Sequence, residues 1–291
     1  MSRLLPLLLA LLPAVAAAHS ASVDATAGRL ATSQGPSTLL AVNVAGSIEL
    51  RPEELLIDVG YTALRDDTRA VGHLALLGCE LILGDHLSVE AIGTFSPPKK
   101  FEEALLGGAL HSESWNAGLL LAASWDSFVA SDFETVIDAA VGATQFGVTR
   151  ETSQERIRQL RLTLGVTETI HQVNDVTLKL GGAFFDGHAA GAPFIARGAQ
   201  PVGTILATAP LRLDGRLGYT RRFGALAATV NLALGRTVEG GALRAVNGRV
   251  SFSPTPTLRL FLSGTAQPEL DAGGAARTSV YGGGGVELRF E

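Results

Sequence analysis

The chain is poor in charged residues and cysteine and has no long apolar run, and each shortage excludes a class of protein. Charged residues make up 18% of the 291 positions against 46% hydrophobic ones, which excludes an intrinsically disordered chain. Cys79 is the single cysteine, which excludes a small disulfide-stapled fold. The longest apolar run, Leu4 to Ala18, has 15 residues, whereas a membrane-spanning helix needs about 20. The body of the chain therefore offers no helical membrane span.

Residues 1–18 have the three parts of a secretory signal. Arg3 supplies the positive end, an apolar stretch runs from Leu4 to Val15, and three alanines fit the small-residue cleavage site. We expect the mature chain to begin at His19. Loss of Arg3 reduces 23 basic residues to 22 against 28 acidic ones, a formal charge of −6 that gives no basic surface for nucleic acid. The sequence predicts an exported, mildly acidic protein.

What the chain has instead is alternation of apolar and polar residues, which is typical of strands whose two faces meet different surroundings. Leu160, Leu162 and Leu164, for example, alternate with Arg161 and Thr163. Twelve segments share this pattern: 54–64, 70–83, 87–96, 115–127, 134–147, 157–170, 176–186, 210–221, 225–236, 241–252, 257–267 and 277–290. Each is at least as long as the 9–11 residues that a tilted strand needs to cross a bilayer.

The connections between these segments sort into two ends. Short turns at 84–85, 128–133, 171–175, 222–224 and 253–256 fall at one end, and the connections at 65–69, 97–114, 148–156, 187–209, 237–240 and 268–276, most of them longer, fall at the other. Short periplasmic turns and longer extracellular loops are typical of bacterial outer-membrane barrels. We predict an all-β, antiparallel transmembrane β-barrel of about twelve strands over residues 53–291.

Residues 19–52 are predicted to form a periplasmic lead or an extra hairpin. The stretch 37–50 also alternates, and Arg51-Pro52 would make a turn into the next segment. With a partner strand in 24–34 the total becomes fourteen, which is the alternative count.

Alternation alone does not tell which face meets lipid, because a soluble exported barrel would turn its apolar side inward. Side chains fill the interior of barrels of around eight strands, whereas larger barrels enclose cavities. Twelve strands with leucines inside would leave a dry void, so the sequence favours an apolar outer band and a wet lumen. Three Tyr and two Trp allow only a thin aromatic belt at the membrane interfaces.

The end of the chain resembles the C-terminal strand signal of outer-membrane barrels. Val286, Leu288 and Phe290 alternate and end on an aromatic residue, although Glu291 makes that residue penultimate. The resemblance implies two partners, the barrel-assembly machinery and outer-membrane lipid.

A second resemblance covers about forty residues near the N-terminus. Its elements are Glu49-Leu50, Gly60-Tyr61, Arg65-Asp66-Asp67, Gly78, Glu80-Leu81, Leu87 and Val89. This stretch resembles the opening of the small outer-membrane β-barrel domain family of gliding deltaproteobacteria, in which a first hairpin with an acidic tip leads into a strand that ends before a short turn. The resemblance implies a barrel in the cell outer membrane but carries no reaction or substrate.

The sequence offers little for catalysis or metal binding. The six histidines are isolated from one another and from Cys79, so we expect no metal site and no cofactor. His111-Ser112 begins like the His-Ser-Asn-Gly motif of outer-membrane phospholipases, but the Asn-Gly is missing. An outer-membrane lipid hydrolase is therefore the least favoured function, and no catalytic residue is predicted.

The polar face carries the candidate functional residues. They are Asp58, Glu80, Glu90 and Asp138 in the first half, and Arg161, Lys179, Arg212, Asp214, Arg216, Arg259, Glu287 and Arg289 in the second. This distribution predicts a basic wall opposite an acidic one. Either the resulting field acts across a water-filled pore, or the charges pair across the lumen and close it.

These observations predict an outer-membrane protein that is a passive channel for small polar solutes and not an enzyme. The alternative is a non-conducting structural or docking barrel of a motility or export complex, with a periplasmic or envelope partner. The loop at 187–209 is long enough to fold into the pore. The solute, the partner and the oligomeric state are left open.

Overall fold

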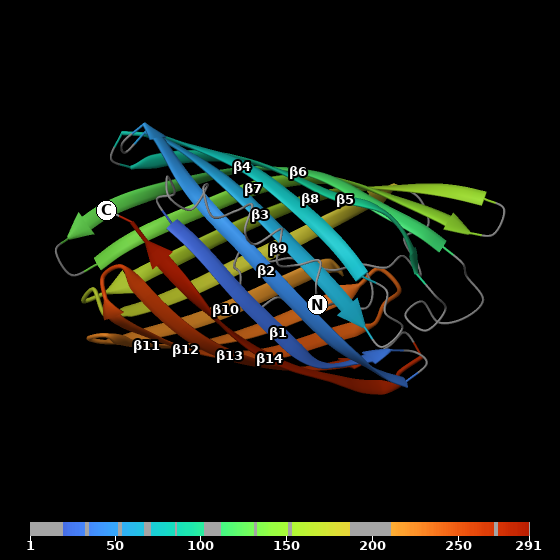
Figure 1. The fold of residues 1–291 in the computed structure, drawn as a ribbon. Coiled ribbons are helices and arrows are strands. Elements are labelled where there is room, and N and C mark those ends of the chain that lie inside the picture. Colours follow the sequence, from blue (N-terminus) through green and yellow to red (C-terminus); the bar gives the residue numbers. More distant parts are fainter. Residues whose placement is uncertain are drawn as a thin grey trace, which may run out of the picture.

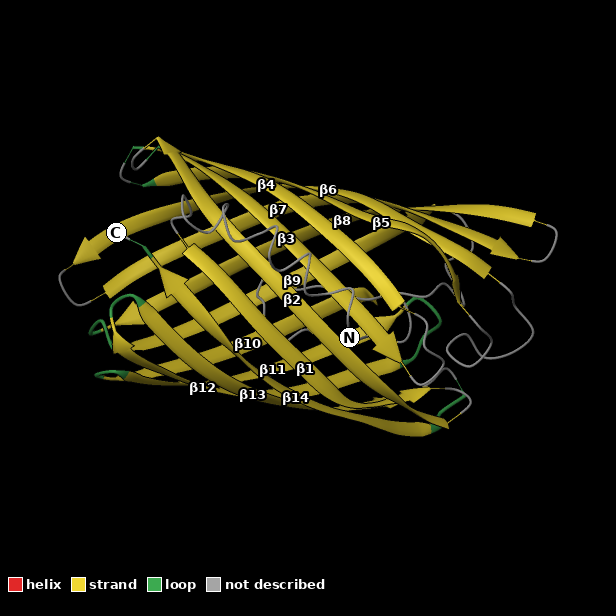
Figure 2. Ribbon diagram, in the orientation of Figure 1, coloured by secondary structure: helices red, strands yellow, loops and turns green. Residues whose placement is uncertain are grey.

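Fourteen strands follow one another along the described part of the chain in the computed structural model, and each pairs antiparallel with its neighbours (Figure 1, Figure 2). They are β1 (Ser20–Thr32), β2 (Gly35–Arg51), β3 (Leu55–Asp66), β4 (Val71–Leu83), β5 (Leu87–Phe101), β6 (Ser112–Ala130), β7 (Phe133–Arg150), β8 (Ser153–Ile170), β9 (Asn174–Asp186), β10 (Leu211–Phe223), β11 (Leu226–Thr237), β12 (Ala242–Thr255), β13 (Leu258–Leu270) and β14 (Ala276–Arg289). β14 also pairs with β1, from Ser20 opposite Arg289 to Arg29 opposite Val280. This pairing closes the sheet into a barrel, and the predicted all-β antiparallel barrel is confirmed.

The structure describes residues 20–32, 35–51, 54–66, 71–84, 86–101, 112–130, 133–150, 153–186, 211–270 and 273–290. The predicted leader, 1–18, and the predicted loop, 187–209, lie outside these ranges. Within them, no helix is long and apolar enough to cross a bilayer.

The preferred count of twelve strands is wrong, and the alternative count of fourteen is confirmed. The two additional strands are β1 and β2, which form a hairpin in the barrel wall between β14 and β3. The alternation of β1 is weak in the sequence because much of its outward side consists of alanine. Ala25 and Ala27, for example, share that side with Val23.

Several strands are longer than the alternation indicates, β6, β7 and β8 among them. β6, β7 and β8 have 19, 18 and 18 residues, and β7 and β8 include residues 148–150 and 153–156 of the predicted loop 148–156. Figure 1 shows β7 and β8 reaching beyond the rest of the barrel at the end away from the C-terminus. The long-loop end of the barrel therefore carries a projecting hairpin made of strand.

The two faces of the wall differ as the alternation predicts. Leu160, Leu162 and Leu164 are about half exposed on the outer face, whereas Gln159 is 4% exposed on the inner face. Most of the exposed aromatic residues lie near the short-turn ends of their strands, where a belt at the membrane interface is expected: Trp125, Phe133, Phe223, Phe252 and Phe290. Phe95 and Phe184 are also exposed but lie farther from those ends. The outer face is thus an apolar band with an aromatic margin at one end.

Candidate functional site

The inner wall of the barrel holds most of the charged residues selected from the sequence. Ten of the twelve are half-buried on the inner face: Asp58, Glu80, Glu90, Asp138, Arg161, Lys179, Asp214, Arg216, Arg259 and Glu287. Arg289 is exposed at the end of β14, where its Nε lies 2.8 Å from Glu287 Oε1. The ten half-buried side chains are treated below as the candidate site.

Arg212 does not join this set. A β-bulge between Leu211 and Leu213 adds one residue to β10, so that Leu211 is 1% exposed while Leu213 is 58% exposed. Leu211 takes the inward position and packs with Ala233 and Leu243. Arg212 is left exposed at the bulge.

Ion pairs on β7 to β10 connect strands that are not neighbours. Asp138 on β7 lies 3.2 Å from Lys179 on β9, across β8. Arg161 on β8 pairs with Asp214 on β10, across β9, and Arg216 Nε lies 3.6 Å from the second oxygen of Asp214. Two arginines therefore share one carboxylate, and the patch keeps a net positive charge.

Glycine makes both crossings possible. Gly165 lies between Asp138 and Lys179 in the register, and a Cβ atom there would be 3.2 Å from both Asp138 Oδ2 and Lys179 Cγ. At Gly181 a Cβ atom would overlap the Arg161–Asp214 pair itself. Because glycine has no side chain, the charged groups on either side meet above its backbone.

An acidic group lies on β3 to β5. Glu80 and Glu90 are register partners on β4 and β5, and Asp58 on β3 interacts electrostatically with Glu90. None of the ion pairs in the described part of the chain includes these three carboxylates. We call Asp58, Glu80 and Glu90 the acidic triad; β3 to β5 lie across the barrel from β10 to β12.

Asp138 was predicted on the acidic wall, but its pairing with Lys179 places it in the basic one. Of the four residues predicted for the acidic wall, Asp58, Glu80 and Glu90 remain on that side.

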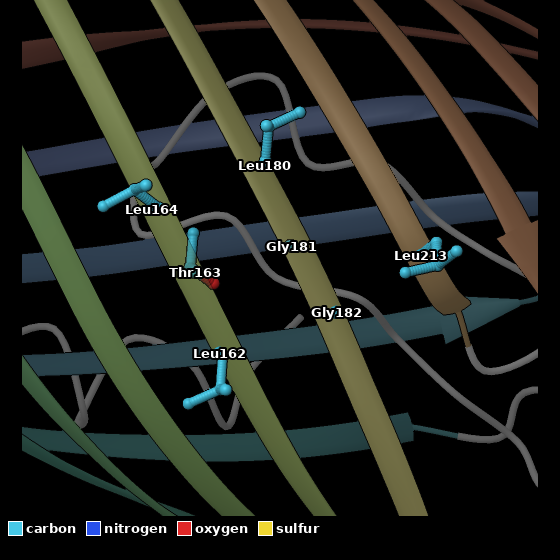
Figure 3. Close-up of a pocket in the computed structure, with 7 residues that line it drawn as sticks. All are labelled: Leu162, Thr163, Leu164, Leu180, Gly181, Gly182 and Leu213. Carbon is cyan, nitrogen blue, oxygen red and sulfur yellow. The ribbon is translucent and has the colours of Figure 1, made fainter.

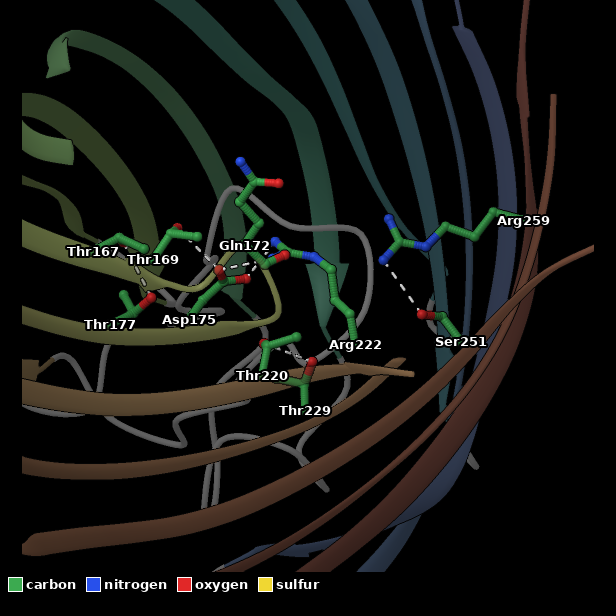
Figure 4. Close-up of polar contacts among 10 residues, drawn as sticks. All are labelled: Thr167, Thr169, Gln172, Asp175, Thr177, Thr220, Arg222, Thr229, Ser251 and Arg259. Carbon is green, nitrogen blue, oxygen red and sulfur yellow. Dashed lines mark hydrogen bonds and ion pairs between the residues drawn. The ribbon is translucent and has the colours of Figure 1, made fainter. Parts of the chain in front are cut away.

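The lower end of the basic side, near the short turns, is rich in hydroxyl groups (Figure 4). Thr167 and Thr177 are hydrogen-bonded at 3.1 Å, and Thr220 and Thr229 at 2.9 Å. Arg259 donates to Ser251 at 3.3 Å and lies 3.6 Å from Glu287. These groups form a polar lining that is held together by hydrogen bonds and by the Arg259–Glu287 ion pair.

At the short-turn rim, one arginine links two hairpins (Figure 4). Arg222 on β10 donates to both oxygens of Asp175, at 3.0 and 2.5 Å, and to the carbonyl of Gln172 at 3.1 Å. His171 and Gln172 have positive φ angles, 51° and 57°, which put that carbonyl at the tip of the β8–β9 turn. Arg222 therefore fixes this turn to the adjacent strand.

Sequence reasoning missed several inner-wall residues, among them Arg249, Phe261 and Asp24. Arg249 on β12 has its guanidinium carbon 4.3 Å from the ring centre of Phe261, and Asp24 on β1 is 2% exposed. Arg249 lies between the outward Gly248 and Val250, so its inward direction was readable from alternation. Asp24 was missed because its strand was interpreted as a lead segment.

A hollow on the wall opens beside Gly182 (Figure 3). Its sides are Leu162, Leu164, Leu180 and Leu213, all about half exposed on the outer face. The hollow is therefore part of the apolar outer band and lies outside the charged site. Among the described residues, no group of three or more His, Cys, Asp and Glu side chains is arranged to hold a metal ion.

Comparisons with known proteins support the fold. Neither a family model nor a curated protein matches the sequence. Among solved structures, the Pseudomonas putida toluene transporter TodX matches with a TM-score of 0.55 at 9% identity, over 93% of this chain and 89% of its own. The CymD monoaromatic hydrocarbon channel matches at 0.54 and 12%, over 94% and 88%, and Acinetobacter baumannii OccAB1 at 0.50 and 10%, over 93% and 96%. The chain thus has the fold of bacterial outer-membrane β-barrel channels.

Proposed function

We propose that the protein is a passive channel for small polar solutes, which cross the outer membrane through the lumen of the barrel. The observation that carries the proposal is that the ion pairs form within one wall. Lys179, Arg161 and Arg216 pair with Asp138 and Asp214, which lie on the same strand or two strands away and not on the far side of the barrel. Charge pairing along a wall does not bridge the lumen, which supports an open barrel over a closed one.

The same pairing gives the lumen an electric field that runs from its basic side to its acidic side. Three carboxylates of the acidic triad face a side where positive charge exceeds negative charge, because Arg161 and Arg216 share Asp214. Charged groups lining a narrow aqueous passage with low-dielectric walls focus the field and concentrate counter-ions. Cations pass along β3 to β5 in this proposal, and the triad gives the channel a weak preference for them.

The outer band supports a place in the outer membrane. Half-exposed leucines and an aromatic margin are what a lipid-facing surface requires. Val286, Leu288 and Phe290 are outward residues at the end of the chain and serve in the proposal as the signal read by the barrel-assembly machinery. Membership of the small barrel family of gliding deltaproteobacteria is part of the same proposal.

The similar structures favour transport over catalysis. TodX is named as a toluene transporter and CymD as a monoaromatic hydrocarbon channel, and both share only the fold with this chain. The charged inner wall indicates polar solutes for this protein instead of hydrocarbons.

Solute-dependent swelling of proteoliposomes tests the proposal. Vesicles containing the refolded barrel are diluted into isosmotic sugars of rising size, and the rate of swelling is followed by light scattering. We expect swelling with small sugars that declines as the solute grows, and none in vesicles without protein. A barrel that is fully folded by gel mobility but gives no swelling with any solute contradicts the channel and favours a docking barrel, whose periplasmic partner would co-purify with it.

A further inference from the structure

The inner wall contains an acid and a base that face one another without pairing. Asp24 and Arg249 interact electrostatically, yet no ion pair joins them. Asn43 donates to one oxygen of Asp24 at 2.7 Å, and the other oxygen, Oδ2, is buried without a hydrogen-bond partner in the described part of the chain. The Nε atom of Arg249 is buried without a partner there as well.

Phe261 keeps the two groups apart. The strand order from acid to base is β1, β14, β13 and β12, and the register places Gly285 between Asp24 and Phe261. A Cβ atom on Gly285 would lie 2.6 Å from both Asp24 Cβ and Phe261 Cζ, so the ring occupies the space above this glycine. The guanidinium of Arg249 lies against the same ring, at 4.3 Å from its centre.

The space above Gly285 differs from the space above the glycines at the other two crossings. At Gly165 and Gly181 the space above glycine is where an acid and a base meet. At Gly285 that space holds an aromatic ring instead, and the acid and the base stay on either side of it. The third acid–base pair is thus held open.

Holding such a pair open costs stability unless something completes it. A buried polar atom without a hydrogen bond loses its hydration and gains nothing in return, and such atoms are few in native proteins. Asp24 Oδ2 needs a donor, and Arg249 needs an acceptor. A molecule that carries both, separated by a short hydrocarbon chain lying on the ring, satisfies the two groups together.

We propose that Asp24, Phe261 and Arg249 form a binding subsite for small zwitterions on the inner wall. Because Asp24 and Phe261 are 2% and 3% exposed, the ring turns away from between the two charged groups when the solute enters. The ammonium group of the solute then donates to Asp24 Oδ2, its carboxylate accepts from Arg249, and its methylene groups contact the displaced ring of Phe261. The subsite deepens the proposed function, because the solute reaches it through the lumen. Binding itself requires only access to the lumen and not passage through it.

Equilibrium binding to the full chain, refolded in detergent, tests the subsite with three probes. 4-Aminobutyrate carries both charges, whereas butylamine and butyrate carry one each. Because each charged hydrogen bond contributes on the order of tenfold in affinity, we expect 4-aminobutyrate to bind about tenfold more tightly than either analogue by isothermal titration. Equal affinity for the three probes overturns the proposal.

Substitutions locate the binding. D24N and R249Q should each remove the advantage of the zwitterion, and R244Q, an equal change of charge at an exposed position on the same strand, should leave it unchanged. F261A should abolish binding because Asp24 and Arg249 are then free to pair, whereas F261L keeps an apolar group in place and retains binding. Should F261A fail to give a heat-modifiable barrel, D24N decides, and undiminished selectivity in D24N refutes the subsite.

The experiments distinguish a failure of the subsite proposal from a failure of the channel proposal. Swelling without any preference for 4-aminobutyrate leaves the channel and removes the subsite. Tight, Asp24-dependent binding in a barrel that passes no solute leaves the subsite and removes the channel.

Discussion

Asp138 and Lys179 form an ion pair at 3.2 Å although a whole strand, β8, lies between them. The pair closes above Gly165, which the register places between the two residues. The same relation recurs between Arg161 and Asp214 above Gly181. Glycines on the inner face therefore set which charges meet, and so which charges remain for solutes.

Gly181→Ala tests this role of glycine. The added methyl group overlaps the Arg161–Asp214 pair, and we expect an overpacking cost of about 1–3 kcal/mol in the free energy of unfolding. The measurement is urea unfolding in lipid vesicles, followed by gel mobility. Gly248→Ala is the control, because a Cβ atom at Gly248 meets nothing within 4 Å. Equal stability of the two variants would show that the crossings do not depend on glycine.

Neutralising the acidic triad should reduce cation preference. The double variant Glu80→Gln and Glu90→Gln removes two of three charges that have no described ion-pair partner, with little change of shape. We expect the reversal potential in a potassium chloride gradient to move toward zero or to the anion side, while the unitary conductance persists. Glu239→Gln at the β11–β12 turn serves as the control. An unchanged reversal potential in the triad variant would show that the acidic triad does not set the ion selectivity.

Arg222 should stabilise the short-turn rim. Arg222→Ala removes a two-point contact with Asp175 and one with the carbonyl of Gln172, and we expect a loss of about 1 kcal/mol because the arginine is partly exposed. Arg51→Ala, which breaks a highly exposed pair at 3.8 Å with Glu54, should have no measurable effect. Equivalent unfolding curves for the two variants would show that the contacts of Arg222 do not stabilise the rim.

A charged side chain on the apolar outer band should destabilise the barrel. Leu180→Arg places an arginine on the outward face, and near the middle of a bilayer such a residue costs about 2–4 kcal/mol in unfolding free energy. Thr163→Arg, on the inner face of the adjacent strand, should cost far less because its side chain remains in water. The comparison is made by unfolding in vesicles. A smaller loss for Leu180→Arg than for Thr163→Arg would mean that the faces are assigned the wrong way round.

Alternation predicted the wall of the barrel well where leucine marks the outer face. β8 to β14 were found in this way, and Leu178 and Leu180 are exposed as their spacing requires. The pattern failed on β1, whose outward side includes Ala25 and Ala27, because alanine contrasts little with the serine and threonine opposite it. Closure by β1 and β14 is a long-range pairing that no local pattern reveals.

The directions of the charged residues were largely readable, but their partners were not. Asp138 meets Lys179 through the register of three strands, and one residue of slippage would separate them. Arg212 lost its inward place through a bulge, which changes the parity of a strand at one point and leaves no mark in the alternation. The odd or even position of a residue along its strand predicts whether its side chain points into the lumen or outward. Its contacts depend on the register between strands, which the sequence pattern does not give.

Single-channel recording in planar bilayers shows whether the charged inner wall lines an open passage. With the refolded barrel in a potassium chloride gradient, we expect discrete conductance steps and a reversal potential on the cation side, set by Asp58, Glu80 and Glu90. Bilayers that stay silent although the barrel is folded and inserted would contradict it.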